Sequence, residues 1–173
     1  MPEAPIEVVE YTPQWVQLFA TERDVLARAL ERWLVGEPEH IGSTAVPGLA
    51  AKPIIDIMAP VASLEASLPA IDAAGPIGYV FYPYKPEVMH WFCKPSPSDR
   101  THHLHLVPAG SQLWADRLAF RDALRASEAL RIEYQALKQS LARTYHNDRG
   151  AYTSAKGPFI ERVLRAACRR CAA

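Results

Sequence analysis

The segment from His40 to Ala59 constrains the fold of this chain more than any other stretch, because it joins a turn rich in glycine and hydroxyl side chains to a short apolar run. Gly42 and Gly48 can adopt backbone conformations that are costly for other residues. Residues 54–59 follow Pro53 as an apolar run of strand length, and Asp56 is the one charged residue within it. The segment therefore predicts a tight turn followed by a buried strand that carries a single carboxylate.

The turn has the composition of a phosphate site. Ser43 and Thr44 can begin a short helix whose free backbone N–H groups suit an anion. Lys52 can reach a phosphate bound there, or it can simply remain solvated, as loop lysines usually do. The residues that we expect to contact a phosphorylated ligand are Gly42, Ser43, Thr44 and Lys52.

Asp56 shares one face of its strand with Ile54 and Met58, whereas Ile55 and Ile57 point the other way, into the predicted core. An acid on such an apolar face can be a metal ligand or a general base. Alternatively, it can be a carboxylate that accepts hydrogen bonds from the backbone of the preceding turn.

A second candidate group is the run His102-His103-Leu104-His105. On a strand, His103 and His105 lie on one face and His102 on the other. Paired imidazoles can bind a metal, contact a phosphate or exchange a proton, although a hydrogen-bonded surface pair is a simpler interpretation. If this strand neighbours Asp56 and the side chains face the same way, the metal or catalytic interpretation is favoured.

The hydrophobic spacing predicts a mixed α and β chain with a helical C-terminal third. Pro60 is expected to end the strand that carries Asp56, and a β-hairpin is expected around residues 83–100. The predicted strands are residues 39–41, 54–59, 79–82, 88–93 and 101–107, and the predicted helices are residues 13–34, 63–74, 112–126, 127–145 and 152–170. This order predicts a mixed sheet of about four or five strands packed with helices.

The chain of 173 residues is expected to form one domain over residues 1–173. No signal-peptide pattern or apolar run of membrane-spanning length is present, and the three cysteines form no disulfide framework, so we expect a cytoplasmic protein with free thiols.

Residues 1–87 carry twelve acidic and five basic side chains, whereas residues 88–173 carry seven acidic and fourteen basic ones. This asymmetry predicts either a basic face for a polyanion or two halves that attract each other.

The segment from His40 to Ile57 resembles the signature of the GrpB-like family, whose members look like divergent nucleotidyltransferases of the DNA polymerase beta superfamily. The histidine run and the helical tail also resemble that family. The tail residues that carry the likeness are Tyr134, Leu137, Lys138, Tyr152, Lys156 and Phe159. The resemblance covers nearly the whole chain and implies a nucleotidyltransferase-like α+β fold.

In that superfamily, a Gly-Ser turn holds a nucleoside triphosphate, and an Asp-x-Asp or Asp-x-Glu pair on the next strand holds the metals. By position, Gly42 and Ser43 match the turn and Asp56 matches the first acid of the pair. Met58 stands where the second acid is expected, and a thioether is a poor ligand for Mg²⁺. The strand of the third acid corresponds to residues 101–107, where this chain offers His103 and His105.

Three functions follow as hypotheses. The first is nucleotidyl transfer from a nucleoside triphosphate to an unidentified acceptor, with Asp56, His103 and His105 as catalytic and metal-binding residues and Mg²⁺, Mn²⁺ or Zn²⁺ as cofactor. The second is a catalytically silent nucleotide-binding or accessory module of the same fold. The third is a metal-dependent hydrolase that uses the aspartate and the two histidines. The expected partner is a nucleotide or another phosphorylated small molecule, and no basic aromatic strip indicates nucleic acid.

Overall fold

The computed structural model describes residues 5–171, with side chains up to residue 169. Its first helix, α1 (Gln14–Ala29), follows Pro13, and the Thr12 hydroxyl accepts a hydrogen bond from the N–H of Gln14 at 3.3 Å. The helix ends five residues earlier than the spacing predicts, because Leu30 leaves the helical conformation. The chain then turns so that Leu34 forms an isolated bridge with Val61.

Five strands form one mixed sheet, as expected. In chain order they are β1 (Glu39–Ile41), β2 (Ile55–Val61), β3 (Val80–Tyr82), β4 (His90–Pro95) and β5 (Arg100–Pro108). In space the order is β1-β2-β5-β4-β3. The central pair, β2 and β5, runs parallel, and the other neighbouring pairs run antiparallel. Strand β3 therefore lies at an edge, next to β4 of the predicted hairpin.

Pro60 does not end β2, contrary to the sequence prediction. Strand β2 continues through Pro60 to Val61, where it still pairs with β5. A proline lacks the N–H that a central strand normally donates. The short β1 pairs with β2 only from Asp56 to Met58, so at Pro60 the β1 side of the ladder requires no such donor.

The remaining helices differ from the sequence prediction at two places. The stretch expected as a helix from residue 63 is helical only in α2 (Ala70–Ala74), which begins directly after Pro69. The last expected helix is divided in two at Lys156, just before Pro158, whose missing N–H disfavours a helix interior. The other elements are η1 (Ser43–Ala45), η2 (Gly75–Ile77), α3 (Gln112–Ala126), α4 (Glu128–Thr144), α5 (Arg149–Ala155) and α6 (Gly157–Cys171).

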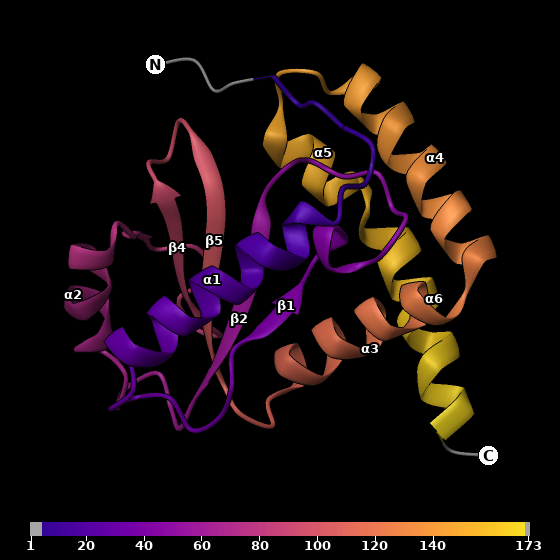
Figure 1. The fold of residues 1–173 in the computed structure, drawn as a ribbon. Coiled ribbons are helices and arrows are strands. Elements are labelled where there is room, and N and C mark those ends of the chain that lie inside the picture. The colour runs from indigo at the N-terminus through magenta and orange to yellow at the C-terminus, as the bar shows by residue number, and fades with distance from the viewer. Residues whose placement is uncertain (1–4, 172–173) are drawn as a thin grey trace.

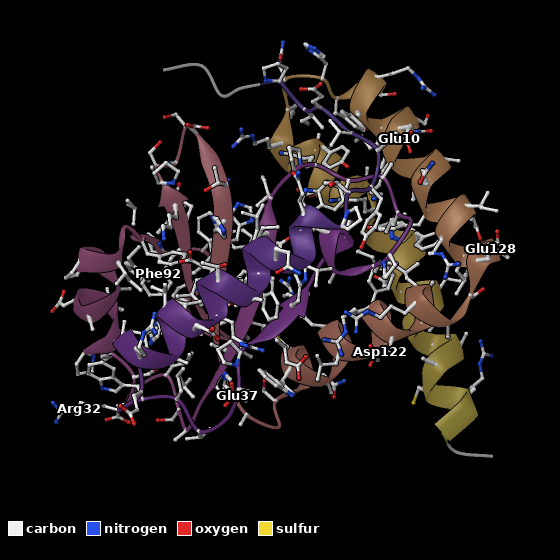
Figure 2. All side chains as sticks on the ribbon, viewed as in Figure 1. Glu10, Arg32, Glu37, Phe92, Asp122 and Glu128 are labelled. Carbon is white, nitrogen blue, oxygen red and sulfur yellow. The ribbon has the colours of Figure 1, made fainter. Side chains whose placement is uncertain are left out.

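One face of the sheet packs against α1 and α2 and forms the main apolar core (Figure 1). Ile55 and Ile57 of β2 point into this core, as the alternation in the sequence predicts. Phe92 of β4 is fully buried in the same layer, where Figure 2 labels it. The α1 side of the sheet is therefore closed by apolar packing.

The opposite face of the sheet carries Asp56 and the paired histidines. Near its β1 side, Met58 and Val107 pack against Trp114 and Leu118 of α3. The helices α3, α4 and α6 form a further apolar cluster with Val46 and Leu49 of the loop after η1, and Figure 1 shows these helices gathered together beside β1. Within residues 5–171, no helix is both long and apolar enough to cross a membrane.

Candidate metal and phosphate site

The register of two parallel strands brings the three predicted metal ligands together. Asp56 of β2 is the direct partner of His103 on β5, and His105 lies two residues further along the same face. This is the arrangement that favours the metal or catalytic interpretation of the histidine pair. His102, as expected, lies on the other face of β5, and its Nδ1 forms a 2.8 Å hydrogen bond with the Thr101 hydroxyl.

The three side chains form a compact group of one oxygen and two nitrogen ligands. Nδ1 of His103 lies 2.9 Å from Oδ1 of Asp56, and Nε2 of His105 lies 3.7 Å from the same oxygen. One ligand atom from each residue fits within 4.8 Å of the others. The side chains of Asp56, His103 and His105 are 26%, 17% and 6% exposed, so the group opens to solvent mainly at the aspartate.

The Nε2 atoms of both histidines are buried and have no hydrogen-bond partner among the residues that the structure describes. Buried polar nitrogens are usually paired, so two such atoms beside one carboxylate mark a place where a ligand is expected. Nδ1 of His105 contacts Sδ of Met89 at 3.4 Å, and a thioether is only a weak acceptor. Nδ1 of His105 thus has only this weak hydrogen-bond partner.

The protonation states of this group suit metal binding. Burial raises the pKa of the Asp56 carboxyl, but contacts with His103 and His105 outweigh burial and hold that pKa below its ordinary value. Burial lowers the pKa of His105 to about 4, although Asp56 opposes the shift. Near neutral pH the aspartate is therefore charged and His105 is neutral, as metal ligands must be.

The turn between β1 and β2 is shaped to approach Asp56. Ile41 at the end of β1 is the strand partner of Asp56, and the next residue, Gly42, has a φ of 71°. A Cβ atom at Gly42 would overlap the Asp56 carboxylate, so only glycine fits. This part of the sequence motif is explained by the close approach of backbone to carboxylate.

Thr44 holds the turn in place. Its buried hydroxyl donates to the carbonyl of Ile54 at 3.0 Å and lies 3.0 Å from Nε2 of His40. The His40 ring stacks on Phe19 of α1 with the ring centres 4.6 Å apart. Because these contacts occupy the hydroxyl, Thr44 does not fit the phosphate contact expected from the sequence.

Ser43 and Lys52 are more accessible than Thr44, because both are half-buried. Ser43 hydrogen-bonds with Tyr134 of α4, a contact that slightly opposes the rise in pKa that burial causes at that tyrosine. The positive charge of Lys52 lowers the pKa of Lys156, which follows α5. Lys52 and Asp56 therefore both act on the charge of Lys156, and a phosphate contact at Lys52 stays a prediction.

Two cations that sequence reasoning did not assign to the site also lie within electrostatic reach of Asp56. Burial lowers the pKa of Arg117 of α3, and Asp56 is the first of the groups that oppose this shift. The pKa of Lys156 is lowered to about 8, mainly by burial. Asp56 opposes this shift, and the positive charges of Lys52 and Arg117 add to it. An arginine stays charged in proteins, so at least one full positive charge is held next to the carboxylate.

Helix α4 holds the loop that follows the turn. The backbone N–H of Ala50 donates to the side chain of Gln135 at 2.9 Å, and the ammonium group of buried Lys138 donates to the carbonyl of Ala50. Both backbone groups of one loop residue are therefore bound by side chains one turn apart on α4. These contacts position the loop between the turn and the strand that carries Asp56.

Three other basic residues near the middle strands do not surround the carboxylate. Lys94 lies in β4, and its ammonium group pairs with Glu22 of α1 at 2.9 Å. Lys85 is exposed, and its ammonium group lies 5.6 Å from the ring centre of Tyr84. The Arg100 guanidinium lies 5.3 Å from the ring centre of Trp91.

The segregated charge is used in part for attraction between the two halves of the chain. Arg121 of α3 pairs with Glu39 of β1 at 2.6 Å and also donates to the carbonyl of His40 at 3.1 Å. Lys94 and Glu22 form a second pair between the halves. The C-terminal helices therefore attach to the sheet through charges as well as apolar contacts.

Residues 5–166 match the family model described as GrpB protein. The chain belongs to the GrpB family. A UPF0157 protein of Deinococcus radiodurans is 37% identical to this GrpB chain over 154 residues, which cover 89% of the chain and 78% of that relative. The glutamate-rich protein GrpB of Alkalihalophilus pseudofirmus is 33% identical, with 91% of this chain and 92% of the relative covered. The resemblance inferred from the sequence motif is thereby confirmed.

The solved structures agree with this assignment. The crystal structure of the conserved protein GrpB from Enterococcus faecalis has a TM-score of 0.86 and 33% identity, and the match covers 96% of this chain and all of that one. A chain in the structure of the GLD-2/RNP-8 complex has a TM-score of 0.55 at 12% identity, covering 85% of this chain and 58% of that one. The second likeness concerns the fold alone, and it is consistent with a nucleotidyltransferase-like GrpB fold.

Met58 marks where this GrpB chain departs from the metal pair expected of nucleotidyltransferases. It occupies the position two residues after Asp56, is fully buried and pairs with His105 in the sheet. Its side chain packs with Ile41 and Met89 under α3. A carboxylate at this position would be enclosed by apolar side chains, so the second acid is replaced by a packing residue.

Proposed function

We propose that this GrpB protein binds a nucleoside triphosphate together with one divalent metal ion and transfers a nucleotidyl group from it to an acceptor. The observation that carries the proposal is the convergence of Asp56, His103 and His105 within electrostatic reach of the cations Arg117 and Lys156. A metal site beside positive charges is suited to a ligand that is both metal-binding and anionic. A nucleoside triphosphate has both properties.

The residues present fit one transition-metal ion better than the two Mg²⁺ ions of carboxylate-rich sites. Mg²⁺ prefers oxygen ligands, whereas one carboxylate and two imidazoles suit Zn²⁺, Mn²⁺ or Fe²⁺. The unpaired Nε2 atoms of both histidines support this choice, because they supply free lone pairs when the rings are neutral. Such an ion would polarise a phosphoryl oxygen and leave coordination positions open for the ligand.

The protein's own residues would neutralise and orient the phosphates. Arg117, with its planar set of donors, can contact two phosphate oxygens at once, and Lys52 and Lys156 add charges that are less directional. In the proposed reaction, an acceptor atom forms a bond to the α-phosphorus, and the bond to the departing pyrophosphate breaks. The cations would stabilise the charge on the pyrophosphate as it leaves.

A catalytically silent module is the second candidate, and the burial of Met58 favours it. Two metal ions can assist both the entering and the leaving oxygen when carboxylates hold them side by side. A site with one carboxylate does not provide this arrangement. A hydrolase that uses water as acceptor would employ the same three ligands. The three candidates share metal and phosphate binding and differ in turnover.

Titration calorimetry tests the shared part of the proposal. ATP, CTP and GTP would be titrated into the protein with Mg²⁺, Mn²⁺, Zn²⁺ or no metal. We expect binding that is strengthened at least about tenfold by Mn²⁺ or Zn²⁺, and we expect Asp56→Asn to remove this gain because the substitution keeps the shape and deletes the charge. The exposed Asp72→Asn is the matched control and should bind as the unaltered protein does.

Separation of the phosphate contacts from the metal ligands needs a second variant. Arg117→Met should weaken triphosphate binding while leaving the affinity for the metal alone unchanged, and Arg165→Met on exposed α6 serves as its control. Release of pyrophosphate, of inorganic phosphate or of neither then distinguishes a transferase, a phosphatase-type hydrolase and a silent module. If no nucleotide binds at millimolar concentration with any of the metals, the proposed function is wrong.

A further inference from the structure

The sheet face that carries the metal ligands continues into a surface of aromatic side chains. Cross-strand pairing places Met58, His105, Trp91 and Tyr82 in one row across β2, β5, β4 and β3. Directly paired residues on neighbouring strands point to the same side of a sheet. Tyr82 on the edge strand therefore faces the same side as His105.

Ring contacts connect this surface to the site without a gap. The ring centre of Trp91 lies 4.9 Å from that of His103, which contacts Asp56. On its other side, Trp91 is met edge-on by Tyr82 at 6.0 Å and by Tyr84 at 6.2 Å. Trp91 is thus the centre of a cluster that begins at a candidate metal ligand and ends at the edge of the sheet.

The outer members of the cluster are exposed although they are large and aromatic. Tyr82 is 52% exposed and Tyr84 is 43% exposed, whereas Trp91 between them is only 7% exposed. On the opposite face of β3, Phe81 packs against the main core, so the strand is already anchored by apolar contacts. The two tyrosines are therefore not needed to attach the edge strand to the molecule.

Tyr84 also lies within electrostatic reach of Arg117, one of the cations proposed to contact phosphate. Asp56 and, after it, the Tyr84 side chain oppose the fall in the pKa of Arg117 that burial causes, so Tyr84 and Asp56 lie within electrostatic reach of the same guanidinium. The Arg100 guanidinium also lies over Trp91 at 5.3 Å. An anion at Arg117 would thus have an aromatic surface beside it.

We infer that Tyr82 and Tyr84, supported by Trp91, form the surface on which the base of the bound nucleotide stacks. This inference rests on the proposed function, because it assumes phosphates at Arg117 and Lys156. Two strand spacings separate β5 from β3, about 10 Å. That is a span that the ribose and phosphates of a nucleotide can bridge. Stacking on tyrosine is tolerant of base identity, because every base has a π-face.

The test compares a nucleotide with its phosphates alone. ATP and inorganic tripolyphosphate would be titrated under the same metal condition into the unaltered protein and into Tyr82→Ala, Tyr84→Ala and the double variant. Stacking on one aromatic side chain changes affinity by about 5-fold to 150-fold. We therefore expect each alanine substitution to weaken ATP binding by an amount in this range and to leave tripolyphosphate binding unchanged.

Conservative and remote variants serve as controls. Tyr82→Phe and Tyr84→Phe keep the ring and should retain ATP affinity within about twofold. Ile132→Ala removes an apolar side chain of α4 that is 64% exposed and should change neither ligand. Circular dichroism of each variant shows whether the edge strand is intact, and the phenylalanine variants keep the comparison informative if an alanine variant does not fold.

The outcomes separate this inference from the proposed function. If tripolyphosphate binds and ATP binds no more tightly, or if both alanine variants lose tripolyphosphate and ATP equally, the stacking surface is wrong and phosphate binding stands. If neither ligand binds, the proposed function fails and the inference fails with it. Selective loss of ATP affinity in the alanine variants, with recovery in the phenylalanine variants, supports the assignment.

Discussion

Gly42 and Asp56 are packed so closely that the carboxylate occupies the space in which a Cβ atom at Gly42 would lie. The contact joins the turn after β1 to the beginning of β2, and Gly42 also has the positive φ that other residues rarely adopt. The turn and the aspartate thus form one unit. A side chain added at Gly42 must displace the Asp56 carboxylate.

Gly42→Ala is expected to damage the site more than the fold. The substitution strains the backbone, because alanine disfavours a positive φ. It also displaces the carboxylate from His103, so metal affinity should fall at least about tenfold. Gly110→Ala is the control, because Gly110 has a φ of 73° with no atom near the added methyl group. Both variants should lose about 1 kcal/mol of stability from backbone strain, measured by urea unfolding, and only Gly42→Ala should lose metal binding. Equal metal affinity in the two variants would contradict the close packing.

One metal ion per chain is expected, with Zn²⁺ or Mn²⁺ preferred over Mg²⁺. The ligands are two imidazoles and one carboxylate, and the position of a second acid is filled by Met58. Metal analysis of untagged protein after dialysis, followed by competition with a chelator, measures both stoichiometry and preference. Two ions per chain, or a preference for Mg²⁺, would exclude the one-metal arrangement. His146→Ala, on an exposed loop, should not change the result.

Stability should depend on pH through His40. Burial lowers the pKa of His40 to about 4, although Asp56 opposes the shift, so the folded state holds this imidazole neutral. The stability that this contributes above the ordinary pKa of 6.5 is lost as the pH falls from 6.5 towards 4, at most about 3 kcal/mol. Urea unfolding of metal-free protein at a series of pH values measures the loss. His40→Gln can keep the contact with Thr44 without titrating, and the acid-dependent loss should be smaller in this variant by roughly one proton's contribution. An unchanged pH dependence would disprove the assignment.

At alkaline pH, Lys138 should act in the same direction as His40, so that stability rises with pH. Burial, with Lys156 nearby, lowers the pKa of Lys138 to about 7, so the unfolded chain binds more protons than the folded one between pH 7 and the ordinary value. Stability should therefore rise by about 2 kcal/mol between pH 7 and 9 because of this group. Lys138→Met should flatten the rise, and the exposed Arg143→Met on the same helix should not. A steeper rise in Lys138→Met than in the unaltered protein would show that another group titrates.

The sheet and the grouping of the three candidate metal ligands could be predicted from sequence because they depend on short-range patterns. Alternation along residues 54–59 and 101–107 determines which side chains share a face. The parallel pairing of the two strands then places Asp56 beside His103 and near His105. The prediction that Pro60 ends the strand was wrong. A proline is tolerated at this position of β2 because the neighbouring β1 is too short to pair with it. That length is not encoded in the residues around the proline.

The cations could not be assigned in the same way. Arg117 lies on an amphipathic helix, where an arginine is most often a solvated residue, and Lys156 lies at a break between two helices. Only the tertiary packing of the C-terminal helices brings their charges within reach of Asp56. Thr44 illustrates the converse, because the motif suggested a ligand contact and the fold uses its hydroxyl for the Ile54 carbonyl.

The parallel pairing of β2 and β5 has a further consequence for how such a site comes into existence. Its three ligands stand on backbone that is already hydrogen-bonded, so their spacing is preorganised before any ion arrives, unlike ligands on loops that an ion must gather. The polypeptide would then fold first and load its metal afterwards, and removal of the ion with a chelator would empty the site without unfolding the chain. Metal availability would switch the chemistry of the protein on and off while its shape stays constant.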